Sequence, residues 1–233
     1  MPTWPVCTSG SRVGVGVKRA LAAYGRALRQ AAQGDTTPID FLSPAGQTLA
    51  RMDAAHWCGD TRPGDQALLR PCDGATLDVG CGPGRLLVAL AQRSMPALGI
   101  DISAEAVVQA RSRGATALLC DVFGHVPAEG RWRHVLLADG NIGIGGDPRR
   151  LLRRCAMLLR RGGTVIVELG APGTGSWRRP VRLRHAGHDS PPFWWAAVAT
   201  SDLPTVAAGA GLRIRHEWNE EGRWFASLSP ATT

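Results

Sequence analysis

Lysine is almost missing from this sequence of 233 residues. Lys18 is the one lysine among 27 basic residues, which leaves 26 arginines, and the formal net charge is +8. A surface built to bind nucleic acid usually combines lysine and arginine with exposed aromatic side chains. Because alanine, glycine and proline are also abundant, we attribute the charge to the coding bias of a GC-rich bacterial genome rather than to a polyanionic partner.

Long apolar runs and paired cysteines are also missing. No run approaches the roughly 18 apolar residues of a membrane-spanning helix, and the polar first ten residues do not resemble a secretory leader. None of the six cysteines forms a CxxC pair, and no cluster of His, Cys, Asp or Glu has the spacing of metal ligands. We therefore expect a cytoplasmic protein with no metal and no membrane partner, and its oligomeric state stays open.

The first third of the chain is predicted to be helical. Apolar residues at Val17, Leu21, Tyr24 and Leu28 repeat at helical spacing, which predicts a helix over 13–33. A second helix is predicted over 44–57. We expect residues 1–72 to form a helical N-terminal lead-in that covers the rest of the protein.

From residue 73 onward, short apolar runs alternate with helical patterns. This order predicts an α/β fold with a mostly parallel sheet. Only residues 219–222 separate the last two strands, which is too short for a parallel crossover, so these strands must form an antiparallel hairpin. Residues 170–200 are predicted to be an insert on the substrate side of a domain that spans 73–233. The expected strands are 75–79, 97–100, 115–120, 133–138, 164–169, 212–218 and 223–228.

A glycine-rich turn, LDVGCGPGR at residues 77–85, lies between the first strand and the first helix of this domain. Glycines there let backbone N–H groups approach a ligand at a helix N-terminus. The dinucleotide-binding pattern would need a glycine at Arg85, and Asp78 would repel a nearby pyrophosphate. The turn therefore favours a ligand with a cationic amino-acid end and no phosphate.

This motif resembles the first motif of class I S-adenosylmethionine-dependent methyltransferases. The resemblance covers about residues 75–228 and includes acidic residues after three further strands. It implies a Rossmann-like, doubly wound, seven-stranded sheet whose last strand is antiparallel. The cofactor would be S-adenosylmethionine, with S-adenosylhomocysteine as the product.

The resemblance also implies roles for particular residues. Asp78 would support the loop or the ammonium group of the ligand, and Asp101 would bind both ribose hydroxyls. Ile102 would pack on the adenine, while Asp121 and the Val122 backbone would bind its edge. Asp139 and Gly140 would line the methionine side. The predicted cofactor-binding residues are Asp78, Gly80, Cys81, Gly82, Gly84, Asp101, Ile102, Asp121, Val122, Asp139 and Gly140.

Catalytic and substrate residues are predicted from position alone. Asn141 lies in a glycine-rich loop and could orient a nucleophile, and His56 and His185 are candidate general bases. An arginine cluster beside several aromatic residues could attract an acidic or aromatic small molecule. The predicted substrate residues are Trp57, Arg178, Arg182 and Trp194.

Three other functions stay open at this point. The basic charge allows an RNA methyltransferase, but the N/D-P-P-Y/F/W motif of enzymes that methylate exocyclic amines is missing. A non-catalytic protein of the same fold could bind S-adenosylmethionine or S-adenosylhomocysteine in a regulatory role. Aminopropyl transfer, or another reaction on the same fold, would use a similar pocket.

Overall fold

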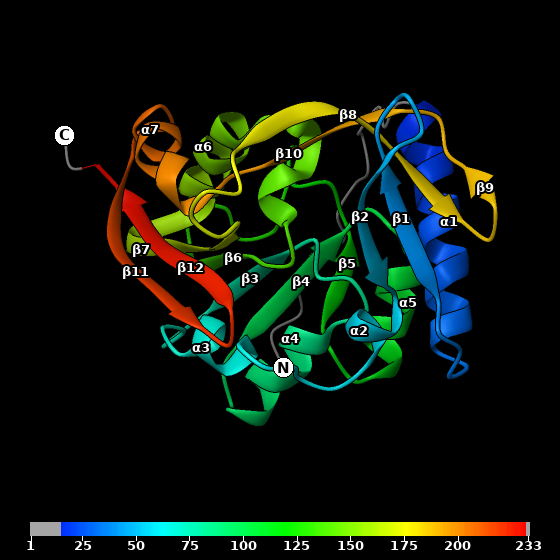
Figure 1. The fold of residues 1–233 in the computed structure, drawn as a ribbon. Helices are drawn as coiled ribbons and strands as arrows, with labels where there is room; N and C mark the ends of the chain where they lie inside the picture. Colours follow the sequence, from blue (N-terminus) through cyan, green and yellow to red (C-terminus); the bar gives the residue numbers. More distant parts are fainter. Residues whose placement is uncertain (1–14, 232–233) are drawn as a thin grey trace.

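The computed structural model describes residues 15–231, and a seven-stranded sheet forms its centre (Figure 1). The strand order is β11-β12-β7-β6-β3-β4-β5. Neighbouring strands from β7 to β5 run parallel, and β12 runs antiparallel to both β7 and β11, which confirms the predicted hairpin. The strands are β3 (Thr76–Val79), β4 (Ala97–Asp101), β5 (Ala117–Leu119), β6 (Trp132–Leu137), β7 (Leu159–Leu169), β11 (Leu212–Glu220) and β12 (Arg223–Pro230).

Helices cover both faces of this sheet, because its central strands are apolar on both sides. Leu136 and Ile166 pack against α3 and α4, whereas Val135 and Val165 pack against α6 and α7. Asp147 caps α6 by accepting a hydrogen bond from the Arg150 N–H, as expected for a residue followed by proline at the first helical position. The helices are α3 (Asp65–Leu69), α4 (Arg85–Gln92), α5 (Ala104–Ser112), α6 (Pro148–Leu158) and α7 (Leu203–Ala208), and two 3-10 turns are η1 (Asn141–Gly146) and η2 (Thr200–Asp202).

A second, smaller sheet lies beside the large one and joins two distant parts of the chain (Figure 1). Its strand order is β10-β8-β1-β2, with β9 paired to β8. The helix α1 (Val15–Ala31) packs along it, so Ala27, Leu28, Ile39 and Leu183 share one cluster. The elements are β1 (Pro38–Leu42), β2 (Thr48–Asp53), α2 (Ala55–Cys58), β8 (Trp177–His185), β9 (His188–Asp189) and β10 (Phe193–Ala197).

The predicted helix over 44–57 is wrong, because β2 and the short α2 occupy most of this range. A tight turn at 43–47 connects β1 to β2, and Gly46 takes a positive φ of 85° there. The strand β1 then pairs with β8, far away in the chain, and this partner supplies backbone hydrogen bonds that a local pattern does not reveal. The segment 170–200, predicted as an insert on the substrate side, contributes three strands to the same sheet.

The predicted helix over 13–33 is confirmed over Val15–Ala31, while residues 13–14, like Cys7 and the first ten residues, lie outside the described part. Cys81, Cys120 and Cys155 are buried in the apolar core. Within residues 15–231, no helix is both long and apolar enough to cross a membrane.

Candidate functional site

A cavity of about 730 Å³ lies between the carboxyl ends of the parallel strands and the small sheet. Open α/β sheets bind their ligands at this edge. We call the lining residues contributed by Arg62, by the strands β3, β4, β5, β6 and β7 and by the segments that directly follow these strands the floor. We call the lining residues from the small sheet, α1 and α2 the roof: Val17, Ala20, Leu21, Tyr24, Ile39, Phe41, Leu49, Ala50, Met52, Trp57, Trp177, Arg179, Leu183, Phe193, Trp194, Trp195, Ala196 and Ala197.

The glycine turn forms the centre of the floor. Gly80, Gly82 and Gly84 all have positive φ values, of 73°, 53° and 84°. A Cβ atom on Gly84 would lie 2.9 Å from the Cβ of Ala110, and one on Gly80 would lie 2.7 Å from the Asn141 Nδ2 atom. The turn therefore needs glycine both for its backbone conformation and for its close packing.

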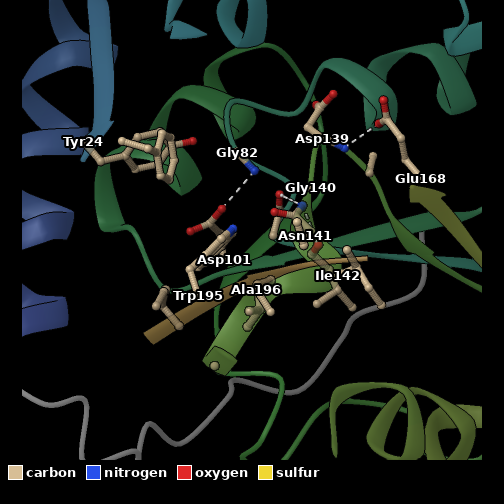
Figure 2. A pocket seen from close by; sticks show the side chains of 18 of the residues that line it. Tyr24, Gly82, Asp101, Asp139, Gly140, Asn141, Ile142, Glu168, Trp195 and Ala196 are labelled. Carbon is tan, nitrogen blue, oxygen red and sulfur yellow. Dashed lines mark hydrogen bonds between the residues drawn. The ribbon is translucent and has the colours of Figure 1, made fainter. Parts of the chain in front are cut away.

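Asp101 lies at the end of β4, beside this turn (Figure 2). Its Oδ2 atom accepts a hydrogen bond from the Gly82 N–H at 2.9 Å, and its Oδ1 atom accepts one from the Ser103 N–H at 2.7 Å. Burial raises the pKa of Asp101. Each oxygen still has a lone pair for a further donor, so the carboxylate is oriented to receive a pair of hydroxyl groups.

Asp78 is buried at the end of β3 and also lines the cavity. Burial, together with the nearby charge of Asp139, raises the pKa of Asp78 to about 7. A cation bound beside this carboxyl group would offset both effects. The ammonium group of an amino-acid ligand fits this requirement.

A network of three arginines and three acids surrounds Asp139, at the end of the floor where the methionine part of the cofactor is predicted to bind. Arg85 pairs with Asp65 and, at 2.5 Å, with Asp139. Arg62 also pairs with Asp139 at 2.5 Å, and Arg223 pairs with Glu168 at 2.8 Å and with Asp65 at 2.7 Å. Although burial opposes it, the bonds from Arg85 and Arg223 lower the pKa of Asp65.

This network was not predicted from the sequence. Its members come from α3, α4, β7, β12 and two loops, so no local motif contains them. The buried Nε atoms of Arg62 and Arg85 have no hydrogen-bond partner among the described residues. A carboxylate-bearing ligand in this part of the cavity would find donors there.

Tyr24 reaches from α1 into the cofactor side of the cavity (Figure 2). Its hydroxyl oxygen lies 3.3 Å from the position that a Cβ atom on Gly82 would occupy. Burial, with the nearby charge of Asp101, raises the pKa of Tyr24 well above its usual value. The ring packs edge-on against Trp57 with a centroid distance of 5.6 Å, so the roof and the glycine turn meet at this point.

The structure brings together ten of the eleven predicted cofactor-binding residues in the lining of one cavity. Gly84 is the exception, because it packs against α5 below the turn. Their contacts with a cofactor stay a prediction. The ten lining residues are Asp78, Gly80, Cys81, Gly82, Asp101, Ile102, Asp121, Val122, Asp139 and Gly140.

The three predicted catalytic residues have different positions. Asn141 lines the cavity, but its side-chain N–H groups donate to the carbonyls of Val79 and Gly80, so it holds the glycine turn. His185 is buried outside the lining, beside the Gln30 side chain and the Pro38 carbonyl. His56 is exposed on α2 and faces a smaller neighbouring pocket. Among the described residues, no histidine lines the main cavity.

The four predicted substrate residues differ in whether they line the cavity. Trp57 and Trp194 line the cavity, but Arg178 and Arg182 do not. Side chains alternate between the two faces of a strand, and β8 directs Trp177, Arg179 and Leu183 toward the cavity instead. Arg178 and Arg182 therefore lie outside the cavity lining, and which residues contact a substrate stays a prediction.

Comparisons with known proteins relate this chain to methyltransferases. Residues 76–163 match the family described as "Methyltransferase domain". A ubiquinone biosynthesis O-methyltransferase from Parvibaculum lavamentivorans is 25% identical over 202 residues, covering 78% of this chain and 74% of the relative. An uncharacterised transposon protein from Streptomyces fradiae is 29% identical over 157 residues, covering 61% of this chain and 41% of the relative. The chain thus spans less than half of that relative.

Solved structures match almost the whole chain. A SAM-dependent methyltransferase from Bacteroides fragilis, solved with S-adenosylhomocysteine, has a TM-score of 0.75 at 20% identity and covers 95% of this chain and 98% of its own. A 1,6-didemethyltoxoflavin-N1-methyltransferase from Burkholderia thailandensis has a TM-score of 0.60 at 13% identity, covering 97% and 94%. These likenesses extend over the small sheet as well as the large one, and they establish the fold.

Proposed function

Because the chain carries a class I S-adenosylmethionine-dependent methyltransferase domain, we propose that it methylates a small molecule. The observation that carries this proposal is the single cavity that joins an acidic, glycine-lined floor to an aromatic roof. The floor has the groups that bind the cofactor, and the roof is the wall left for an acceptor. Both parts line the same cavity.

The floor residues fit S-adenosylmethionine. Asp101 would bind the ribose hydroxyls, Asp78 the ammonium group, and the Arg62 and Arg85 side chains lie where donors for the carboxylate are needed. When bound, the cofactor supplies an electrophilic methyl group and becomes S-adenosylhomocysteine. The chain itself contributes orientation, since methyl transfer is an in-line displacement whose rate depends strongly on alignment.

A small acceptor is supported by the size of the cavity and by its largely apolar roof. A volume of about 730 Å³ falls within the range of small-molecule sites. The relative from Parvibaculum lavamentivorans is an O-methyltransferase of ubiquinone biosynthesis. The structure from Burkholderia thailandensis is that of a 1,6-didemethyltoxoflavin-N1-methyltransferase. We extend from them only the class, a small cyclic acceptor.

A non-catalytic binding protein is the second candidate. The cavity holds no histidine and no lysine among its described lining residues, and its carboxylates lie in the floor, where Asp139 and Glu168 are paired with arginines. A general base in the roof would have to be Tyr24, whose pKa is raised well above its usual value. An acceptor that needs no deprotonation by the protein would still react. Turnover therefore separates this candidate from the first.

The test is a transfer assay with S-adenosylmethionine labelled in the methyl group. The protein would be incubated with a panel of small phenols, aromatic acids and heterocyclic amines, and separately with total RNA. We expect label in a small-molecule product and none in RNA. Binding of S-adenosylmethionine without transfer to any compound would favour the regulatory candidate, and label in RNA would refute the small-molecule proposal.

A further inference from the structure

Arg179 is the one charged side chain in the roof as defined above. Every other roof residue is aliphatic or aromatic. Acidic residues lie on the opposite side of the cavity, in the floor, where Arg62, Arg85 and Arg223 already neutralise part of their charge. The charge of Arg179 is therefore isolated within an apolar wall.

Arg178, Arg179 and Arg182 of β8 form no ion pair among the described residues, and of these three Arg179 alone lines the cavity. The other two arginines of the small sheet are paired. Arg51 pairs with Asp40 at 2.6 Å, and Arg184 pairs with Asp189 at 2.6 Å. Within residues 15–231, Arg179 forms no ion pair, and its guanidinium carbon lies 4.7 Å above the ring centre of Trp177. A half-buried guanidinium without an anion has donors available for a ligand.

Several aromatic rings lie in the roof near this cation. Trp195 lies opposite Arg179 in the pairing of β10 with β8, so both side chains occupy the same face of the sheet. The Trp195 ring lies 6.4 Å from that of Phe41 and 6.2 Å from that of Phe193. Rings that come from three strands form a wall on which a flat molecule could stack.

Resting on the proposed function, we propose that the acceptor is a planar aromatic compound with one anionic group, and that Arg179 binds this group. The guanidinium can donate two parallel hydrogen bonds to a carboxylate while Trp177 holds its plane. The aromatic wall selects the ring, and Arg179 selects the charge. Arg179 is thus a specificity-determining residue, and the methylated atom is a separate part of the acceptor.

Matched probes separate the ring from the charge. The full-length protein, saturated with S-adenosylhomocysteine, would be titrated by calorimetry with 2-naphthoate, with neutral 2-naphthamide and with the non-planar decahydro-2-naphthoate. We expect 2-naphthoate to bind at least about tenfold more tightly than either of the other two, because each lacks one of the two recognised features. Arg179→Gln should remove the preference for 2-naphthoate over 2-naphthamide.

Arg178→Gln is the matched control, since Arg178 neighbours Arg179 in sequence but does not line the cavity. It should keep the preference, and the melting shift with S-adenosylhomocysteine would verify that both variants are folded. Equal affinity for naphthoate and naphthamide, no binding of either probe to the loaded protein, or an equal loss in Arg178→Gln would overturn the inference while the proposed function stands. Failure to bind S-adenosylhomocysteine would instead refute the proposed function itself.

Discussion

Asp78 predicts how cofactor binding depends on pH. Burial, with the nearby charge of Asp139, raises the pKa of Asp78 to about 7, compared with roughly 3.9 for an ordinary aspartate. A cationic ligand binds the ionised carboxylate, so affinity follows the ionised fraction. That fraction falls from about nine tenths at pH 8 to about one tenth at pH 6, which predicts an affinity for S-adenosylhomocysteine about tenfold weaker at pH 6.

The same pKa has the opposite consequence for the stability of the free protein. Between about pH 4 and pH 7 the folded state holds a proton that the unfolded chain has lost, so stability falls as the pH rises through this window. Three pKa units correspond to about 4 kcal/mol. Asp78→Asn should therefore raise the melting temperature of the free protein at pH 8 while weakening its binding of S-adenosylhomocysteine.

Isothermal titration of S-adenosylhomocysteine at pH 6, 7 and 8 measures this effect directly. In Asp78→Asn the affinity should be low and should change much less over the same range. The raised pKa of Asp101 acts in the same direction, so a weak slope in this variant is expected. An affinity in the unaltered protein that is constant from pH 6 to pH 8 would refute the reasoning.

Three further predictions concern a buried ion pair, a closely packed glycine and an exposed histidine. Arg85→Met leaves the fully buried Asp65 without one partner and should reduce the free energy of unfolding in urea by about 3–5 kcal/mol, with partial recovery in the double variant that adds Asp65→Asn. Gly143→Ala places a Cβ atom against the backbone of β10 and should cost about 1–3 kcal/mol in the same measurement, whereas Gly59→Ala, with its nearest atom at 3.4 Å, should cost less. His56→Ala should leave kcat/KM unchanged, since this exposed side chain lies outside the main cavity; a large loss would restore it as a general base.

The sequence predicts the large sheet well because its signals are local. Each parallel strand is a short apolar run, and helix caps such as Ser103 and Asp147 lie next to the helices they begin. The acidic residues at the strand ends come together simply because parallel strands share one edge. For the same reason ten predicted cofactor residues line one cavity.

The small sheet and the charge network could not be predicted in this way. Pairing of β1 with β8 depends on residues such as Phe41 and Leu183, which are far apart in the chain, and neither strand has a marker for its partner. Arg62 and Arg223 acquire their roles only when distant loops meet at Asp139. The sequence also did not reveal that Arg178 and Arg182 would lie outside the cavity lining, because the pairing of β8 with β1 and β10 determines which of its faces meets the cavity.

Binding of S-adenosylhomocysteine to the unaltered protein and to Asp101→Ala is the most direct test of the whole account. Calorimetry should show one site per chain, no binding of NAD, and a large loss of affinity in the variant, because Asp101, held by the Gly82 and Ser103 N–H groups, is the carboxylate that we propose binds the ribose hydroxyls. A melting curve of each protein would verify that the variant is folded. Equal affinity in the two proteins, or binding of NAD alone, would contradict the assignment of the floor as the cofactor site.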